Sequence, residues 1–234
     1  KFAIETVNRR VKLIIGTSHM VADEIVNFSN FCLDAGADAV MILPPYYFHF
    51  GAEALLQYYD RLAAQIHGNI YIYNFPDNTG YTISPQTVLA LAKIHPNIVG
   101  MKDTSGDITQ TSEFIRRTRD VEFKVFGGKD TLLYASLCHG AVGGVCTAAN
   151  FMPELITDVY NKYAAGDLAG SLEAQFKLNP VRLSMDAASF PVAAKDMANL
   201  RGRKVGVPYL PTLPTPEGAA KQGFVKTMTE AGLL

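Results

Sequence analysis

The sequence has few cysteines and no long apolar run. Its three cysteines, Cys32, Cys138 and Cys146, are too few and too scattered for a disulfide framework or a zinc site of the CxxC type. They indicate reduced, buried thiols in a cytosolic protein. No stretch approaches the roughly 18 uninterrupted apolar residues of a membrane span, and the first ten residues lack the apolar core of a signal peptide. We therefore expect a cytoplasmic protein with no membrane partner.

Charge of either sign is also scarce, and the two signs nearly balance. Charged residues make up 18% of the 234 residues, and Lys+Arg 21 against Asp+Glu 22 leaves a net charge of −1. Without a basic excess, the electrostatic attraction that drives most nucleic-acid binding is missing, so nucleic acid is not an expected partner. The 48% of apolar residues is enough for a large buried core and excludes intrinsic disorder.

What the chain does contain is a repeating pattern of short apolar runs. Each run ends in Gly, Pro or a polar cluster and is followed by an amphipathic stretch with helical periodicity. Nearly continuous apolar runs are typical of parallel strands buried on both faces, so helices are expected on both sides of the sheet. The six runs span residues 11–17, 37–45, 69–76, 97–103, 123–129 and 141–150.

The spacing of these runs predicts six βα units. Ser84 and Pro85 predict the N-cap and the first position of one of the helices. The pattern leaves two architectures open, an open doubly wound sheet and part of an eight-stranded barrel. A nucleotide-binding sheet would need a phosphate loop, and the nearest match, around Gly128 and Lys129, has Asp130 in place of the Ser or Thr that would hold magnesium.

The last third of the chain is predicted to be helical. A proline-rich turn is expected before a final helix that ends at Leu234. We therefore divide the chain into a βα-barrel portion, residues 1–152, and a second part, residues 153–234, with the last barrel helix and a C-terminal helical appendix. The helices expected before the proline-rich turn span residues 153–165, 168–185 and 190–200.

Reactive side chains recur at one point of the repeating unit, the C-terminal end of a strand. Tyr47, Tyr73 and Lys102 all lie there, and active sites of α/β sheets and barrels are built at that face. A lysine that ends a buried strand can be partly desolvated, which favours the uncharged amine that a nucleophile needs. The alternatives are a solvated Lys102–Asp103 ion pair and a core tyrosine at position 73.

The histidines give no sign of a metal site. They show no metal-ligand spacing and are interpreted as surface or loop residues, so neither a metal nor another cofactor is expected. The histidines are His19, His49, His67, His95 and His139.

A family resemblance emerges from five strings that occur in order: LPPYY, YIYNFPDNTG, IVGMKDTSGD, VFGGKD and GAVGGVCTAANFMPE. In these strings the sequence resembles the dihydrodipicolinate synthase and N-acetylneuraminate lyase family of pyruvate-dependent class I aldolases. The resemblance implies an α/β fold of the TIM (β/α)8-barrel type that lacks its first two strands in this chain. It also implies that the family's threonine-rich loop, which holds the pyruvate carboxylate, has no counterpart here.

The resemblance implies roles for three catalytic residues. Lys102 matches the lysine that forms a Schiff base with pyruvate or another 2-oxo acid. Tyr73 matches the tyrosine that carries protons to and from the substrate. Tyr47 matches a tyrosine lent across a tight dimer interface, which implies a homo-oligomer, a dimer of dimers.

It also implies substrate contacts. Val145 matches the residue beside bound pyruvate, and Gly128, Asp130 and Thr147 lie where lyases of the family contact the substrate tail. Asn78 stands where dihydrodipicolinate synthases carry an arginine that pairs with the carboxylate of the second substrate.

Because a neutral amide cannot replace that bidentate contact, the sequence favours a Schiff-base-forming lyase that acts on pyruvate or a hydroxylated 2-oxo acid, such as a 2-keto-3-deoxy sugar acid. One alternative is dihydrodipicolinate synthase, also named 4-hydroxy-tetrahydrodipicolinate synthase. Another is a 2-oxo acid dehydratase. The non-enzyme alternative is a catalytically impaired protein that binds a 2-oxo acid.

Overall fold

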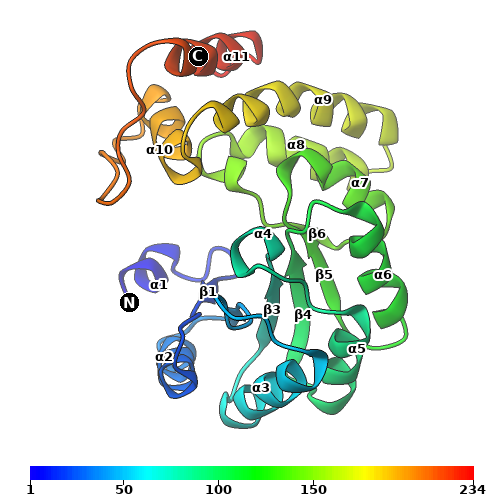
Figure 1. Ribbon diagram of the computed structural model, residues 1–234. Helices are drawn as coiled ribbons and strands as arrows, with labels where there is room; N and C mark the ends of the chain where they lie inside the picture. Colours follow the sequence, from blue (N-terminus) through cyan, green and yellow to red (C-terminus); the bar gives the residue numbers. More distant parts are fainter. The chain divides into compact units, whose positions relative to one another are not determined.

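The structure, a computed structural model, describes all 234 residues and divides into two compact units (Figure 1). Unit 1 comprises Lys1–Gly128 and His139–Val142, and unit 2 comprises Lys129–Cys138 and Gly143–Leu234. The division of the chain at residue 152 that the sequence suggested stays a prediction.

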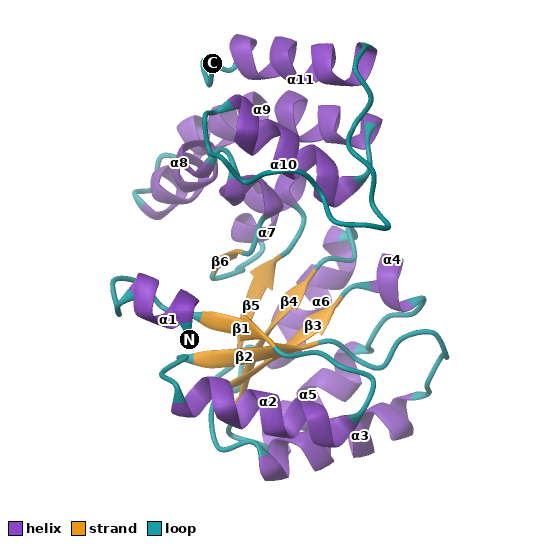
Figure 2. Ribbon diagram, turned by 90° about the vertical axis from the view of Figure 1, so that its left-hand side faces the viewer, coloured by secondary structure: helices purple, strands orange, loops and turns teal.

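Unit 1 is built on five parallel strands that pair in chain order (Figure 2). They are β1 (Ile14–Gly16), β2 (Ala39–Ile42), β3 (Ile70–Asn74), β4 (Ile98–Asp103) and β5 (Lys124–Gly127). The helices of this unit are α1 (Phe2–Val7), α2 (Ala22–Asp34), α3 (Ala52–Gln65), α4 (Pro76–Thr79), α5 (Pro85–Ile94) and α6 (Ile108–Thr118). The parallel sheet forms a half-barrel, and each of its strands falls within one of the apolar runs.

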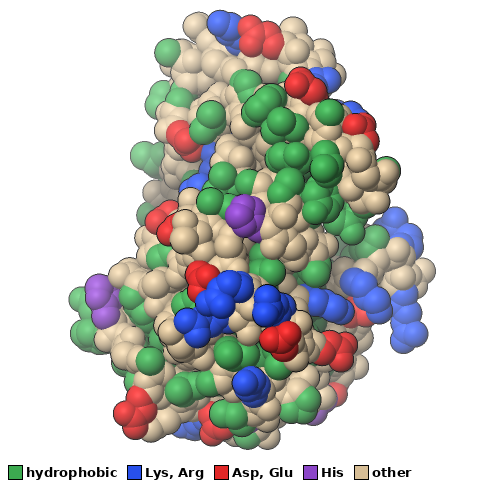
Figure 3. Space-filling model, turned by 90° about the vertical axis from the view of Figure 1, so that its right-hand side faces the viewer, with side chains coloured by type: hydrophobic (Ala, Val, Ile, Leu, Met, Phe, Trp, Pro, Cys, Tyr) green, Lys and Arg blue, Asp and Glu red, His purple; other side chains and the backbone are tan.

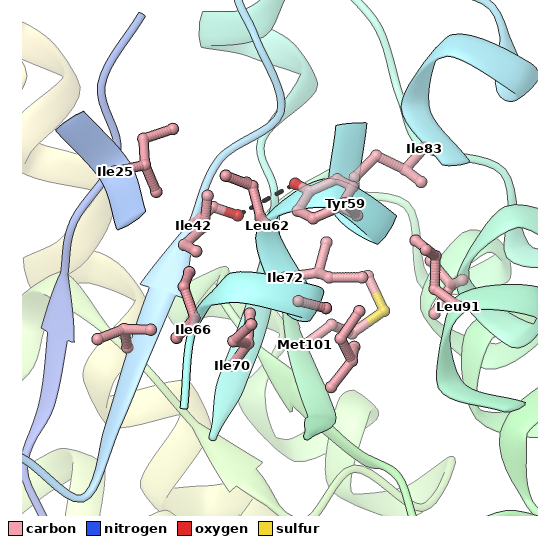
Figure 4. Packing of buried hydrophobic residues seen from close by; sticks show 14 of the residues in the cluster. Ile25, Ile42, Tyr59, Leu62, Ile66, Ile70, Ile72, Ile83, Leu91 and Met101 are labelled. Atoms are coloured by element: carbon pink, nitrogen blue, oxygen red, sulfur yellow. Dashed lines mark hydrogen bonds between the residues drawn. The ribbon is translucent and has the colours of Figure 1, made fainter. Parts of the chain in front are cut away.

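The main core of unit 1 lies between the sheet and helices α2, α3, α5 and α6 (Figure 4). Ile70 and Ile72, two residues apart on β3, both point into it, as the period of two in a strand requires. The Tyr59 hydroxyl of α3 is buried in this core, where it donates a hydrogen bond of 3.1 Å to the Ile42 carbonyl. Each fully buried isoleucine contributes about 1.5–3 kcal/mol to folding.

The opposite face of the sheet carries a smaller apolar cluster of Ala39, Met41 and Tyr71. The four helices α2, α3, α5 and α6 lie on one side of the sheet only, so the expectation of helices on both sides is wrong. In a half-barrel, the second face of each strand is the concave interior, which is filled by side chains from the strands themselves.

Local signals place the helix ends. Ser84 caps α5, because its hydroxyl accepts a hydrogen bond of 3.1 Å from the backbone N–H of Thr87, and Pro85 is the first helical residue as expected. Asp107 caps α6 in the same way, accepting from the N–H of Thr109 at 2.8 Å. The short helices α1 and α4 were not foreseen from the pattern.

Unit 2 is mainly helical. Its elements are η1 (Asp130–Leu132), α7 (Leu133–Cys138), β6 (Gly143–Gly144), η2 (Thr147–Asn150), α8 (Pro153–Ala164), α9 (Leu168–Ser184), η3 (Met185–Ala187), α10 (Phe190–Leu200) and α11 (Ala219–Glu230). The three helices expected over residues 153–200 are present.

Two expectations for unit 2 need correction. The run 141–150 contains the sixth expected strand, but this strand is only two residues long and a 3-10 turn follows it, because the glycines supply no side chains to pack on a longer strand. The last helix ends at Glu230 instead of Leu234, because Gly232 adopts a left-handed φ of 68° and the N–H of Leu233 turns back to the Met228 carbonyl.

Cys32 is buried, but Cys138 is exposed at the end of α7, so the expectation of buried thiols is wrong for that residue.

Figure 3 shows basic and acidic side chains side by side on one face of the molecule. On α6, Arg116 makes two hydrogen bonds to Glu113, of 2.6 and 2.8 Å. None of the helices is both long and apolar enough to cross a membrane.

Candidate active site

Lys102 and Tyr73 meet at the C-terminal ends of adjacent strands. They are register partners on β4 and β3, and the Lys102 amine donates a hydrogen bond of 3.0 Å to the Tyr73 hydroxyl. The amine nitrogen also lies 4.2 Å from the centroid of the Tyr73 ring. Phe75 stacks on that ring at 5.4 Å between centroids and 16° between planes, which restrains the tyrosine. Two of the three side chains that the sequence predicts to be catalytic, Lys102 and Tyr73, are therefore in direct contact.

A shift of register in β4 turns Lys102 toward Tyr73. Ile70 pairs with Ile98, but the next residue, Tyr71, pairs with Gly100, so β4 contains one extra residue at this point. Because side chains alternate along a strand, one extra residue reverses the face of every residue after it. Lys102 consequently lies on the concave face with Tyr71 and Tyr73, although it is an even number of residues from the outward-facing Ile98.

Gly128, the residue directly after β5, lies against Lys102. A Cβ atom at this position would be 2.8 Å from Lys102 Cε, 2.8 Å from the Asp103 carbonyl oxygen and 2.0 Å from Thr104 Oγ1. The Gly128 N–H donates to that same Asp103 carbonyl at 2.7 Å. Only glycine leaves room for β5 to approach the lysine this closely.

Thr104 is a candidate functional residue that sequence reasoning missed. Its side chain is buried, with 7% of its surface exposed, and its hydroxyl oxygen has no hydrogen-bond partner within the protein. Buried hydroxyls are ordinarily satisfied, so this one is available to a ligand. The signal was present in the string IVGMKDTSGD, because a residue two positions beyond Lys102 continues the same face of the strand.

A tyrosine near this pair has a shifted pKa. Burial raises the pKa of Tyr71, which precedes Tyr73 by two residues on the same face of β3. Its ring packs at 5.6 Å from that of Phe126. The Tyr71 hydroxyl therefore stays protonated at neutral pH.

The structure does not bring Tyr47 or Asn78 into contact with this pair. Tyr47 is 83% exposed, has a positive φ of 82°, and packs edge-on against Phe48 at 4.9 Å. Asn78 is exposed on α4. No hydrogen bond joins either residue to Lys102, and their roles stay predictions.

Three other predicted substrate contacts lie in unit 2. Asp130 is buried there, where its carboxylate accepts a hydrogen bond of 2.6 Å from the Ala148 N–H and lies 3.6 Å from the Arg182 guanidinium. Both Val145 and Thr147 are half-buried. Their contacts with a substrate, and that of Asp130, stay predictions.

The arrangement in unit 1 combines a primary amine with a phenol at hydrogen-bond distance. An amine beside a proton donor and acceptor can attack a carbonyl group and exchange protons with the adduct. No group of three or more His, Cys, Asp or Glu side chains is placed to hold a metal ion.

Comparison with known proteins identifies relatives along the whole chain. The family model of the dihydrodipicolinate synthetase family matches residues 1–231. A 4-hydroxy-tetrahydrodipicolinate synthase of Methanoculleus marisnigri is 37% identical over 209 residues, which are 89% of this chain and 71% of the relative.

Solved structures agree. A dihydrodipicolinate synthase from Thermotoga maritima superposes with a TM-score of 0.95 at 26% identity, covering 100% of this chain and 79% of that one. A prophage protein of the dihydrodipicolinic acid synthase family from E. coli K12, solved in complex with pyruvate, gives a TM-score of 0.92 at 28% identity, again covering 100% of this chain and 79% of that one. With Lys102 and Tyr73 in contact at the strand ends, the chain belongs to the dihydrodipicolinate synthetase family, whose members are lyases of the class I aldolase type.

Proposed function

We propose that Lys102 forms an imine with the carbonyl carbon of pyruvate or another 2-oxo acid. The observation that carries the proposal is the 3.0 Å contact between its amine and the Tyr73 hydroxyl. Attack of the amine gives a carbinolamine, and loss of water from it breaks the C–O bond as the departing oxygen takes up a proton. Tyr73 is placed to supply that proton. The iminium then withdraws electrons, which permits either loss of a proton from the adjacent carbon or cleavage of the next carbon–carbon bond.

Borohydride reduction in the presence of pyruvate tests this step. We expect one reduced adduct, on the Lys102 peptide, by mass spectrometry, and none in Lys102→Ala. An adduct on Lys129 instead would contradict the assignment. Pyruvate binding without any adduct would favour the non-enzyme alternative, a 2-oxo acid binding protein.

For the overall reaction, we propose condensation of pyruvate with aspartate semialdehyde, as in 4-hydroxy-tetrahydrodipicolinate synthases. The relatives that carry this name support it, the first of them at 37% identity. In this reaction the enamine derived from the iminium attacks the aldehyde carbon.

Cleavage of a hydroxylated 2-oxo acid is the second candidate, and Asn78 favours it. Asn78 is exposed and neutral at the position where the family resemblance implies an arginine in the synthases, and Asp77 beside it adds a negative charge. Loss of a charged hydrogen bond of about 1.5–3 kcal/mol weakens binding of a second carboxylate by roughly 10- to 150-fold. Comparing kcat/KM for aspartate semialdehyde condensation and for cleavage of a 2-keto-3-deoxy sugar acid decides between the two, and the faster reaction identifies the function.

Thr104 is proposed to donate its hydroxyl hydrogen to the bound 2-oxo acid. Its unpartnered oxygen and its position two residues beyond Lys102 support this role. Thr104→Val keeps the shape of the side chain, so we expect a raised KM for pyruvate and an unchanged melting temperature. An unchanged KM would contradict the role.

We also propose a cytoplasmic homo-oligomer, a dimer of dimers, in which Tyr47 reaches the site of a neighbouring subunit. Its 83% exposure and positive φ of 82° support this, because strained backbone at an exposed aromatic residue is common at functional positions. Light scattering that showed an active monomer would contradict the shared site.

A further inference from the structure

A buried carboxyl group lies directly beyond the lysine. Asp103 is 3% exposed and follows Lys102 at the end of β4. Its oxygens accept four hydrogen bonds: from Asn74 Nδ2 at 2.8 Å, the Ser105 N–H at 3.2 Å, Ser105 Oγ at 2.9 Å and Thr111 Oγ1 at 2.6 Å. Burial of a carboxyl group is costly unless its oxygens are satisfied, and here hydrogen bonds satisfy both of them.

Its partner on the neighbouring strand, Asn74, is also fully engaged. Asn74 is 0% exposed, and its side-chain oxygen accepts hydrogen bonds from the Ile83 N–H at 3.0 Å and from Thr82 Oγ1 at 3.1 Å. Its backbone carbonyl accepts from the Thr104 N–H at 2.9 Å. The pair thereby ties the ends of β3 and β4 to each other, to the loop before α5 and, through Thr111, to α6.

The register connects this pair to the chemistry. Asn74 and Asp103 are paired residues, immediately after the pair Tyr73 and Lys102. Alternation along the strands places the two pairs on opposite faces of the sheet. The hydrogen bond between Asn74 and Asp103 therefore locks the two strands together one residue beyond the contact between the lysine and the tyrosine, without touching the space that a substrate would occupy.

We propose that Asn74 and Asp103 are positioning residues that hold the Lys102 amine against the Tyr73 hydroxyl. This inference rests on the proposed imine chemistry of Lys102. Hydrogen bonds require a particular direction and length, whereas apolar contacts tolerate small displacements. A fully satisfied polar pair therefore fixes the position of the end of β3 relative to the end of β4. A displacement of 1 Å in a reacting group can cost about 100-fold in rate.

Reciprocal substitution tests the pair. Asp103→Asn places two amides opposite each other, and Asn74→Asp places two carboxyl groups there. We expect each single variant to lower the rate of borohydride trapping at Lys102, measured with saturating pyruvate, by roughly 10- to 100-fold. The swapped double variant, N74D/D103N, regains an amide opposite a carboxyl group and is expected to recover at least half of the lost factor on a logarithmic scale.

A matched control separates positioning from general destabilisation. Thr118→Val removes another buried hydroxyl of α6. This hydroxyl donates to the Phe114 carbonyl at 2.8 Å and lies at the C-terminal end of α6. It is expected to lower the melting temperature but to trap pyruvate at the wild-type rate below that temperature. If the Asp103 variants do not fold, Thr111→Val removes one of the four bonds, and we expect it to lower the trapping rate by a smaller factor.

The pH dependence of trapping identifies the cause of any loss. A positioning role predicts a lower plateau rate without displacement of the profile along the pH axis. A profile displaced along the pH axis with an unchanged plateau would overturn the inference, as would wild-type rates in every variant or a double variant no better than the single ones. Absence of trapping in the wild-type protein would instead overturn the proposed imine chemistry.

Discussion

Gly128→Ala is predicted to damage both stability and imine formation. The added methyl group would lie 2.0 Å from Thr104 Oγ1 and 2.8 Å from both Lys102 Cε and the Asp103 carbonyl oxygen. The threonine can rotate and the lysine can bend, but the carbonyl accepts the Gly128 N–H and belongs to the strand, so it cannot withdraw without disturbing β4. The variant must therefore displace the lysine, the strand, or both.

The expected magnitude follows from the cost of overpacking, about 1–3 kcal/mol. For a chain of this length, each kcal/mol lowers the melting temperature by about 2–4 °C, so a fall of about 2–12 °C is expected. If the Lys102 amine is displaced by about 1 Å, the rate of borohydride trapping with pyruvate is expected to fall by roughly 100-fold.

Thermal melting and trapping kinetics measure the two effects separately. The matched control is Gly16→Ala on β1, where a Cβ would have no atom within 4 Å, and its free energy of unfolding should stay within about 0.5 kcal/mol of the wild type. If Gly128→Ala melts and traps pyruvate like this control, the close approach of β5 to Lys102 has no energetic consequence and the reasoning is refuted.

Three further predictions concern single residues. Tyr73→Phe should keep the melting temperature and lower kcat by about 10²- to 10⁴-fold; an unchanged kcat with a lower melting temperature would make Tyr73 a purely structural residue. Burial raises the pKa of Tyr81 from 10.0 to about 12. As the pH rises, the Tyr81 hydroxyl therefore loses its proton in the unfolded chain before it does so in the folded protein. The stability that the neutral hydroxyl provides below pH 10 is lost as the pH rises to 12. Denaturant titrations over this range should show a smaller loss in Tyr81→Phe, and equal slopes would contradict the shift. Gly223→Ala on α11, where a Cβ meets no atom within 4 Å, should raise the free energy of unfolding by roughly 0.5–1 kcal/mol. A decrease would contradict this prediction, because it would show that the added methyl group strains the helix.

Much of the fold could be read from local patterns. Apolar runs bounded by Gly, Pro and polar residues correspond to β1 to β5, since a parallel strand needs a continuous apolar segment of about that length. Ser84 and Pro85 marked the start of α5, because a side-chain cap and a fixed φ act within a single turn. The run 141–150 does contain the sixth predicted strand, but its small apolar residues offer little surface to pack, so the strand is limited to Gly143 and Gly144.

The candidate site, like the fold, could be predicted only in part from the sequence. Lys102 and Tyr73 were found because both end strands that the sequence makes parallel, and parallel strands carry their C-terminal ends to one edge of the sheet. Thr104 and the buried pair of Asn74 and Asp103 were not assigned roles, because burial and hydrogen-bond satisfaction depend on the neighbouring strands and helices. A lone polar residue after a strand gives no indication of whether its partners exist.

The sequence by itself determined the residue types, the order of the βα units and the edge at which the reactive groups collect, because periodicity, turn residues and strand direction are local properties. Only the tertiary structure decided which way Lys102 faces. One extra residue between Ile98 and Gly100, seen only in the pairing with β3, reverses the alternation of β4. Without this extra residue, Lys102 would lie on the outer face of the sheet with Ile98, and Met101 would face inward. Which residue of a strand is left unpaired depends on the strand beside it, and so the contact between amine and phenol is a property of the sheet.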